Sequence, residues 1–333
     1  MNILGIESSC DETAAAIVRN GNVIASSVVA SQIETHHKYG GVVPELASRM
    51  HVEAILPVVE SAFSEAGMTL SDIEGIAATR GPGLIGALLV GFSFAKAVAF
   101  AKGLPFAGVN HLEAHIYSLF LMENSPDFPF IALVVSGGHT NIYFVSSYHQ
   151  FELMGQTRDD AAGEVFDKVA KMLGLGYPGG PIIEKLSKTQ NPDTIHFPRT
   201  FLEKGSCDFS FSGLKSAVAR YIHEHNVKGT EEKTKVAASF QAAVIDVLTY
   251  KLICAAAVKK CTRIGVTGGV SANQTFVNQL SEHAGKKKIQ VFAPPISLCG
   301  DNAAMVAARG FTMIQNNDLC QLNHDVFSRT RIF

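Results

Sequence analysis

Two histidines four residues apart, in the segment Asn110-His111-Leu112-Glu113-Ala114-His115, are the clearest chemical feature of this chain. The segment predicts the first turns of a helix that continues to about Phe120. With about 3.6 residues per turn, positions i and i+4 lie on the same helix face. Two imidazoles on one face can bind the same metal ion. The spacing therefore allows a metal site, although two ordinary helix-surface histidines would share it.

The position of Glu113 argues against a metalloprotease. Zinc proteases of the His-Glu-x-x-His type carry their catalytic glutamate directly after the first histidine. Here the glutamate is displaced by one residue, and on a helix it projects to nearly the opposite side from His111 and His115. We therefore reject the protease interpretation.

A third ligand has to come from another part of the chain. Two neutral imidazoles and one carboxylate form a ligand set with open positions, which suits Fe(II) and also zinc or manganese. Asp301 is the candidate, because it follows Gly300 at the start of a helix expected over 301–314. On position alone, however, the pattern favours Asp301 as the N-cap of that helix.

An acidic turn between the first two expected strands is a second chemical feature. It contains Glu7, Asp11 and Glu12. Three carboxylates would be costly to bury without partners, so we expect them to face a cleft or the solvent. In a cleft they could bind a cation, orient a substrate amine or act as a general base.

Three glycine-rich turns, at 136–138, 179–180 and 268–269, are the third feature. Backbone N–H groups in such turns can bind phosphate, helped by a following helix N-terminus. No G-x-x-x-x-G-K-[ST] loop is present. A bound nucleotide is still plausible. Asp167 and Asn273 could then bind ribose hydroxyls or base edges, or could be a surface residue or a cap.

The order of expected elements repeats in the two halves of the chain. Each half has a strand, a polar turn, two more strands, helical material, and then a strand, a glycine-rich loop and a helix. We interpret this as an internal duplication of one α/β unit. Strands are expected at 3–6, 14–18, 23–29, 73–79, 105–109, 130–135, 141–146, 151–155, 263–267 and 289–293. Helices are expected at 51–66, 84–101, 161–173, 213–225, 231–261 and 301–314, a tight loop at 174–181 and irregular chain at 190–211.

A proline-containing stretch at 124–129 is the best candidate for a domain boundary. We expect an N-terminal lobe at 1–125, which the segment 301–333 could complete. The C-terminal lobe would be 126–300, with a helical insert at 157–262.

Composition limits the class of protein. The chain has 333 residues, of which 28 are basic and 30 acidic. Its overall charge therefore does not indicate a nucleic acid or an anionic membrane as a binding partner. Its six cysteines contain no C-x-x-C pair and are expected to be reduced thiols. No signal peptide is evident, and the apolar run at 84–101 is too short and interrupted for a membrane span. We expect a cytoplasmic protein with no membrane partner.

Several of these stretches, in this order, resemble the TsaD family of bacterial tRNA threonylcarbamoyladenosine transferases, once called glycoproteases. The motifs that carry the resemblance are Gly5-Ile6-Glu7-Ser8-Ser9-Cys10-Asp11-Glu12-Thr13, His111-Leu112-Glu113-Ala114-His115, Val135-Ser136-Gly137-Gly138-His139-Thr140, Tyr177-Pro178-Gly179-Gly180-Pro181, Phe209-Ser210-Phe211-Ser212-Gly213-Leu214-Lys215 and Asp301-Asn302-Ala303-Ala304-Met305. Two small departures are Ser8 and Gly300, each of which stands where threonine is common in the family.

The resemblance implies the duplicated two-lobe actin-like ATPase fold, with a cleft between the lobes. It implies that His111, His115 and Asp301 hold one iron or zinc ion per subunit, which reverses the cap interpretation of Asp301. It suggests Glu12 or Asp11 as the group that helps to deprotonate the attacking amine. The residues that would bind the substrate are Val134, Val135, Ser136, Gly137, Gly138, Asp167, Gly180, Asn273 and, less directly, Glu184.

The implied reaction is acyl transfer. The threonylcarbamoyl group would pass from threonylcarbamoyl-adenylate to the N6 amine of adenosine 37, in tRNAs that read codons beginning with A, with release of AMP. A separate synthase would make the adenylate, TsaB-like and TsaE-like proteins would be partners, and ATP or ADP could also bind. Candidate tRNA contacts are Lys96, Lys102, Lys215, Lys259, Lys260, Arg263, Arg329 and Arg331.

Two other functions fit the same fold. An ATP-dependent small-molecule kinase would use Mg²⁺, which prefers oxygen ligands, so the two imidazoles argue against it. A non-catalytic nucleotide-binding scaffold would have no stoichiometric iron or zinc.

Overall fold

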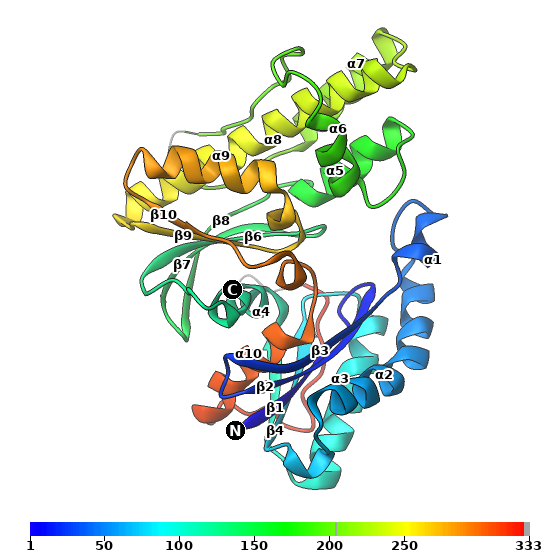
Figure 1. The fold of residues 1–333 in the computed structure, drawn as a ribbon, viewed down its shortest axis with the longest axis vertical. Helices are drawn as coiled ribbons and strands as arrows, with labels where there is room; N and C mark the ends of the chain where they lie inside the picture. The colour runs from blue at the N-terminus through cyan, green and yellow to red at the C-terminus, as the bar shows by residue number, and fades with distance from the viewer. Residues whose placement is uncertain (204, 330–333) are drawn as a thin grey trace. The chain divides into compact units, whose positions relative to one another are not determined.

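The computed structural model describes residues 1–203 and 205–329, which fall into two compact units. Unit 1 comprises Met1–Ser125 and the described residues from Gly300 onward, and unit 2 comprises Pro126–Cys299. Figure 1 shows that each unit contains its own sheet with helices packed on it. All six cysteines lie in the described part of the chain, and none of them forms a disulfide.

The sheet of unit 1 has the strand order β3-β2-β1-β4-β5. Its strands are β1 (Asn2–Glu7), β2 (Glu12–Arg19), β3 (Val23–Ser31), β4 (Gly75–Gly81) and β5 (Phe106–Asn110). β1 is antiparallel to β2 and parallel to β4, β2 is antiparallel to β3, and β4 is parallel to β5. Asn20 and Gly21 form the turn between β2 and β3, and both have positive φ, as an Asn-Gly hairpin requires.

The sheet of unit 2 repeats this arrangement. Its strands are β6 (Phe130–Val135), β7 (Thr140–Ser147), β8 (Gln150–Gln156), β9 (Arg263–Thr267) and β10 (Gln290–Phe292), in the order β10-β9-β6-β7-β8. β6 is antiparallel to β7 and parallel to β9, β7 is antiparallel to β8, and β9 is parallel to β10. Read from the other edge, the order and the directions match those of unit 1, so the predicted duplication is confirmed.

Helices cover both faces of the unit 1 sheet. On one face α2 (Pro44–Ala66) and α3 (Ile85–Lys102) pack against the side chains of alternate strand residues, among them Leu4 and Ile6. On the other face lies α10 (Ala303–Gln315). A Cβ atom at Gly5 would lie 2.3 Å from the carbonyl oxygen of Ala303, so this glycine lets the first turn of α10 approach β1 directly.

Unit 2 contains the helices α5 (Ala162–Met172), α6 (Gly179–Ser187), α7 (Ser212–Glu224), α8 (Thr230–Lys259) and α9 (Gln274–Gly285). A 3₁₀ turn, η3 (Gly269–Ala272), precedes α9. By length and composition alone, α3 and α8 could each cross a membrane. The apolar window of α8 is 61% buried, whereas that of α3 is 33% buried, so the explanation of a core helix fits α8 better than α3.

Two expectations about the helices were wrong. The segment Gly179–Pro181, expected as the end of a loop, begins α6, and α2 begins at Pro44, seven residues earlier than expected. In both cases a proline lies in the first turn of the helix. Its missing N–H costs nothing there, because the first N–H groups have no partner within the helix. The short helix α1 (Ile33–His37) was also missed.

Candidate functional site

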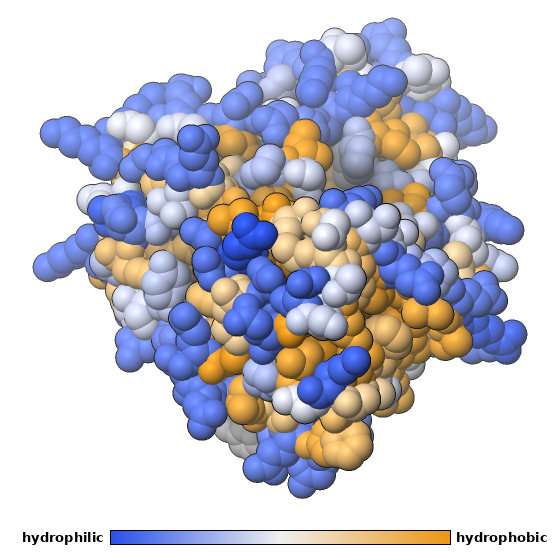
Figure 2. All heavy atoms as spheres, turned by 60° about the horizontal axis from the view of Figure 1, so that its bottom comes forward, coloured by the Kyte–Doolittle hydropathy of each residue, from blue (hydrophilic) through white to orange (hydrophobic). Residues whose placement is uncertain are grey.

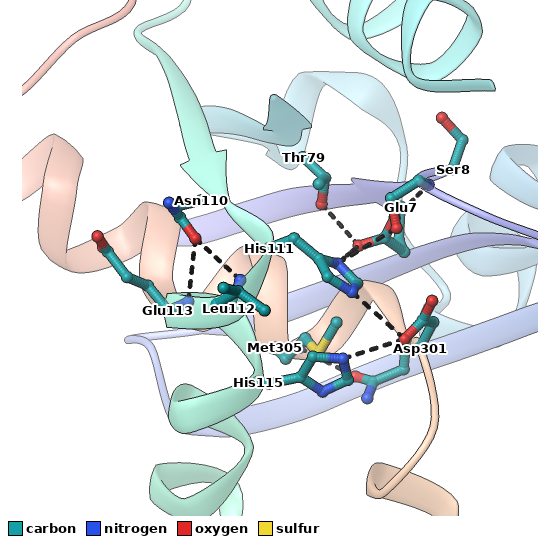
Figure 3. Close-up of polar contacts among 12 residues, drawn as sticks. Glu7, Ser8, Thr79, Asn110, His111, Leu112, Glu113, His115, Asp301 and Met305 are labelled. Atoms are coloured by element: carbon teal, nitrogen blue, oxygen red, sulfur yellow. Dashed lines mark hydrogen bonds and ion pairs between the residues drawn. The ribbon is translucent and has the colours of Figure 1, made fainter. Parts of the chain in front are cut away.

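Helix α4 (His111–Tyr117) presents the two histidines, and a short 3₁₀ turn, η2 (Ser118–Leu121), continues it. Asn110 caps the helix, because its side-chain oxygen accepts hydrogen bonds from the backbone N–H groups of Leu112 and Glu113. His111 is only 5% exposed and His115 is fully buried. They are therefore not ordinary surface histidines, and Figure 3 shows both rings turned toward Asp301.

Asp301 lies one residue before the cap of α10. The cap is Asn302, whose side-chain oxygen accepts a hydrogen bond of 3.0 Å from the N–H of Met305. The prediction from position alone, that Asp301 is the N-cap, is therefore wrong by one residue. The Oδ1 atom of Asp301 lies 3.1 Å from Nε2 of His115 and 3.6 Å from Nε2 of His111 (Figure 3).

These three side chains fit one metal ion. Their ligand atoms all lie within 4.8 Å of one another. Two ligands bound at about 2.1 Å, at angles between tetrahedral and octahedral, are about 3.0–3.4 Å apart. The two distances to Asp301 are close to this range, and a set of two imidazoles and one carboxylate is a common one for divalent transition metals. The residues of unit 1 can thus hold a metal without large rearrangement.

Glu7, the last residue of β1, contacts the His111 ring at Nδ1. This fully buried carboxylate accepts hydrogen bonds from the Ser9 N–H at 2.5 Å and the Thr79 hydroxyl at 2.7 Å. Its Oε2 atom also lies 3.1 Å from Nδ1 of His111. Burial alone would lower the pKa of His111, but the carboxylates of Asp301 and Glu7 outweigh it and raise the pKa to about 9. Simple exposure of the acidic turn is therefore wrong for Glu7.

The other two carboxylates of the acidic turn lie near Asp301. Burial, the charge of Asp11 and the charge of Asp301 together raise the pKa of Glu12 to about 10. A hydrogen bond with Asp11 contributes to the same shift. Glu12 is therefore protonated at neutral pH in the metal-free protein. A cation bound at Asp301 would oppose the shift, because it would offset one of the negative charges that cause it.

Glu113 ties α4 to α10. Its Oε2 atom accepts a hydrogen bond of 2.8 Å from Nε of Arg309 and lies 2.8 Å from Nη2 of the same side chain, which is 6% exposed. Nearby, the hydroxyls of Tyr117 and Thr312 lie 2.8 Å apart. A glutamate held in this way does not act as the base of a protease. Sequence reasoning missed Arg309, although a single arginine inside an apolar helix is a signal that a buried partner exists.

In unit 2, backbone hydrogen bonds hold the ends of the glycine turn after β6, and its two glycines have open space beside them. The Ser136 N–H donates to the carbonyl of His139 at 2.8 Å, and the Gly163 N–H donates to the carbonyl of Ser136 at 3.2 Å. Gly268 has φ of +94°, and a Cβ there would lie 2.5 Å from the carbonyl oxygen of Val135. By contrast, Cβ atoms at Gly137 and Gly138 would meet nothing within 4 Å. Space for a ligand therefore exists at these two glycines.

The side chains of Val134 and Val135 are fully buried in the sheet. A ligand could therefore reach only their backbone.

The remaining candidates in unit 2 connect α5, α6 and α9. Asp167 accepts a hydrogen bond of 2.7 Å from the N–H of Gly179, at the start of α6. Glu184 accepts one of 3.1 Å from the N–H of Gln274, at the start of α9. Gly180 has open space where a Cβ would lie. These contacts fix the two helix N-termini relative to each other.

Asn273 has a structural role. Its side-chain oxygen caps α9 by accepting from the Phe276 N–H, and its Nδ2 donates to Gln241 at 2.8 Å. Gln241 was not anticipated, because its position inside the long helix α8 gives no sequence signal.

Several candidate tRNA contacts are engaged within the chain. Lys96 donates to the carbonyl of His324, Lys215 pairs with Asp160, Lys259 with Glu152 and Arg263 with Asp127. Arg331 lies outside the described residues. The three that pair with carboxylates, Lys215, Lys259 and Arg263, are thus partly neutralised.

Comparison with solved structures defines the class of protein. The chain is similar to HypF of T. kodakarensis, with a TM-score of 0.65 and 13% identity over 95% of this chain and 48% of that one. It is also similar to component A of the (R)-2-hydroxyglutaryl-CoA dehydratase of Acidaminococcus fermentans, with a TM-score of 0.56 and 14% identity over 95% and 99%. With its two equivalent sheets, the chain has the actin-like ATPase fold.

The sequence places the chain more narrowly. A family model described as "TsaD: tRNA N6-adenosine threonylcarbamoyltransferase" matches residues 23–308, and the chain belongs to this family. A protein of that name from Desulforapulum autotrophicum is 62% identical over 99% of both chains. Another from Syntrophus aciditrophicus is 52% identical over 99% of this chain and 97% of its own length.

Proposed function

We propose that this chain transfers the threonylcarbamoyl group of threonylcarbamoyl-adenylate to the N6 amine of adenosine 37 in tRNAs that read codons beginning with A. The nitrogen attacks the carbamoyl carbon and forms a C–N bond. The bond from that carbon to the phosphate oxygen breaks, AMP leaves, and the amine loses a proton. The observation that carries the proposal is the similarity to the Desulforapulum autotrophicum relative, which is 62% identical over 99% of this chain. The aligned region includes the positions of all three metal-ligand candidates.

The ion that we propose for His111, His115 and Asp301 is Fe(II), with Zn²⁺ as the alternative, one per subunit. Two imidazoles and one carboxylate with open positions are typical of non-haem iron, and zinc accepts the same ligands. When bound, the ion supplies Lewis-acid stabilisation to an oxygen ligand. The chain itself provides the fixed helix α4, the capped start of α10 and the buried Glu7, so that the donors are already close together.

The glycine turn after β6 is the proposed phosphate site of unit 2. A Cβ at Gly137 or Gly138 would meet nothing within 4 Å, and the same holds for Gly180, the second residue of α6. N–H groups at such positions bind phosphate oxygens and would stabilise the charge of AMP as it leaves. ATP or ADP could bind through the same groups. Asp167, Glu184 and Asn273 hold the helix starts that frame this site, together with the backbone of Val134, Val135 and Ser136.

Glu12, or its neighbour Asp11, is the proposed group that accepts the proton of the amine. A carboxyl group with a pKa of about 10 is protonated at neutral pH and cannot serve as a base. The role therefore requires that a cation at Asp301 lowers the pKa of Glu12. A substitution of Glu12 by Gln that keeps full single-turnover transfer and full metal content would exclude this residue.

A reconstitution experiment tests the proposed function. The protein is incubated with TsaB-like and TsaE-like proteins, a threonylcarbamoyl-adenylate synthase, threonine, bicarbonate, ATP and unmodified tRNA, and the nucleosides are analysed by mass. We expect adenosine that carries a threonylcarbamoyl group, dependent on threonine. The Desulforapulum autotrophicum relative serves as a control. If that relative makes the adduct and this chain does not under the same conditions, the proposal is wrong.

A TsaB-like protein is the partner that we assign to the exposed face of α2 and α3. This face, defined by Val52, Leu56, Ile85, Leu89 and Phe100, carries large apolar side chains that are 41–70% exposed. Figure 2 shows apolar side chains gathered on the face that lies at the bottom of Figure 1, where these helices of unit 1 are. A chain of near-neutral charge with partly neutralised cations also needs help to bind tRNA in the cytoplasm.

The partner assignment can be tested with charged substitutions. Leu56→Glu combined with Leu89→Glu should abolish co-purification with the TsaB-like protein, because two charges would lie in an apolar interface. Val23→Glu is the matched control, since Val23 is 52% exposed but belongs to β3. Equal binding by the double variant and the control would place the partner on another surface.

A further inference from the structure

We infer that Glu7 is a positioning residue for the metal centre, and that it holds the His111 ring with Nδ1 protonated and Nε2 directed at the ion. The inference rests on the metal site proposed for His111, His115 and Asp301, but not on the acyl transfer. Glu7 would not be a ligand itself. Its carboxylate would act through the imidazole, as carboxylates behind metal-bound histidines commonly do.

The hydrogen bonds around Glu7 leave the carboxylate little freedom. Oε1 accepts from the Ser9 N–H. Oε2 accepts from the Thr79 hydroxyl and faces Nδ1 of His111 (Figure 3). The N–H of Ser9 belongs to the backbone and can only donate, so it fixes which oxygen remains for His111. Both oxygens of Glu7 accept hydrogen bonds from neighbouring groups, so we assign the donor role in the contact with His111 to Nδ1. The nitrogen left for a metal ion, which would displace any proton there, is then Nε2, the ring nitrogen that faces Asp301.

One other group lies near the same nitrogen. The Ser9 hydroxyl is 3.2 Å from Nδ1 of His111. A hydroxyl can either donate or accept, so it does not define which nitrogen of the ring is protonated. The Glu7 side chain does define it, because its two oxygens already accept from Ser9 and Thr79, and it is fully buried. The geometry therefore assigns the selection of the ring nitrogen to Glu7, with Thr79 fixing the position of its Oε2 atom.

Substitution of Glu7 by Gln is expected to reverse the pattern. The amide oxygen must face the Ser9 N–H, so the amide NH₂ faces His111 and donates to Nδ1. The ring proton then moves to Nε2, where it blocks the metal. We expect Zn²⁺ affinity, measured by competition with a chelator, to fall about 10- to 100-fold. Thr79→Val leaves the carboxylate in place and should weaken Zn²⁺ by a few fold at most, because only the position of Oε2 is loosened.

The matched control for Thr79→Val is Thr13→Val. Thr13 is also a buried threonine of the same sheet, and its hydroxyl lies 2.7 Å from Nδ1 of His51, which is outside the metal centre. It should lose similar folding stability with no change in Zn²⁺ affinity. An equal loss of affinity in both variants would show a general structural effect and overturn the role of Thr79.

A spectroscopic measurement on the unaltered protein does not depend on whether any variant folds. In the zinc-loaded chain labelled with ¹⁵N-histidine, His111 should show a hydrogen-bonded Nδ1–H and a metal-bound Nε2. Zinc bound at Nδ1, or wild-type Zn²⁺ affinity in a folded Glu7→Gln protein, would overturn the inference. Failure of the unaltered protein to bind zinc or iron would instead refute the proposed metal site, so the two failures can be told apart.

Discussion

The turn between the first two strands occurs once in each sheet, and the two copies have opposite character. In unit 1 Glu7 ends β1, Asp11 lies in the turn and Glu12 begins β2. The Ser8 hydroxyl of this turn donates to the carbonyl of Ala87 in α3. In unit 2 the equivalent turn, at 136–139 after β6, has two glycines with open space around them. The first turn is thus lined by its own acidic side chains, whereas the second has open space at its two glycines.

This difference suits the two turns to opposite kinds of ligand. Carboxylates attract a cation and repel phosphate, whereas exposed backbone N–H groups attract an anion. The strand order and the directions of pairing are the same in both units, so the fold does not decide which ligand binds. The residues placed in one turn decide it. The predictions below test whether the two turns work independently.

The largest effect is expected from Asp301→Ala. It removes the carboxylate nearest both histidines, so stoichiometric iron or zinc should be lost and transfer should fall by about 1000-fold or more. Elemental analysis and single-turnover transfer measure this. Binding of the adenylate to unit 2 should change much less. A variant that keeps its metal would show that the three side chains are not the ligand set.

The next largest effect is expected when the glycine turn of unit 2 is given a carboxylate, as in the acidic turn of unit 1. Gly137→Asp places a carboxylate where the phosphate is proposed to bind, and like charges in contact cost several kcal/mol. Adenylate affinity should fall about 100-fold or more, with metal content unchanged. Gly137→Ala is the control, because a Cβ at this position meets nothing within 4 Å. If the aspartate variant binds the adenylate normally, the phosphate lies elsewhere.

Local sequence patterns predict some parts of the fold and of the metal centre, but not others. The histidine pair was identified from helical spacing, and the duplicated sheets from the order of the elements. Local patterns could not distinguish Asp301 as a ligand from Asp301 as a cap, because the capping residue is its neighbour Asn302. The burial of Glu7 and the pairing of Glu113 with Arg309 depend on contacts between residues about 70 to 200 positions apart, which no local period encodes.

A moderate effect is expected when the ion pair between Glu113 of α4 and Arg309 of α10 is broken. Arg309→Met leaves Glu113 partly buried without its partner, which should lower the free energy of unfolding by about 1–3 kcal/mol. Zn²⁺ affinity should fall as well, because the helix with both histidines loses its link to the helix that follows Asp301. Denaturant unfolding and chelator competition measure the two effects. The double variant Glu113→Gln with Arg309→Met should lose less stability than the two single variants summed.

The smallest effect concerns the charge of the acidic turn itself. The unfolded chain releases the proton of Glu12 near its ordinary pKa of 4.5, whereas the folded metal-free chain keeps it up to a pKa of about 10. Between these values the folded state binds more protons, so Glu12 lowers stability progressively as pH rises. Glu12→Gln removes this dependence. It should therefore stabilise the metal-free protein relative to the unaltered chain at pH 8 by about 1 kcal/mol, with little difference at pH 4.

Saturating zinc should shrink the difference in stability between Glu12→Gln and the unaltered chain, because a cation at Asp301 stabilises the ionised form of Glu12. A difference that zinc does not change would mean that the acidic turn of unit 1 does not respond to a cation, and the contrast with the glycine turn of unit 2 would then lose its electrostatic basis.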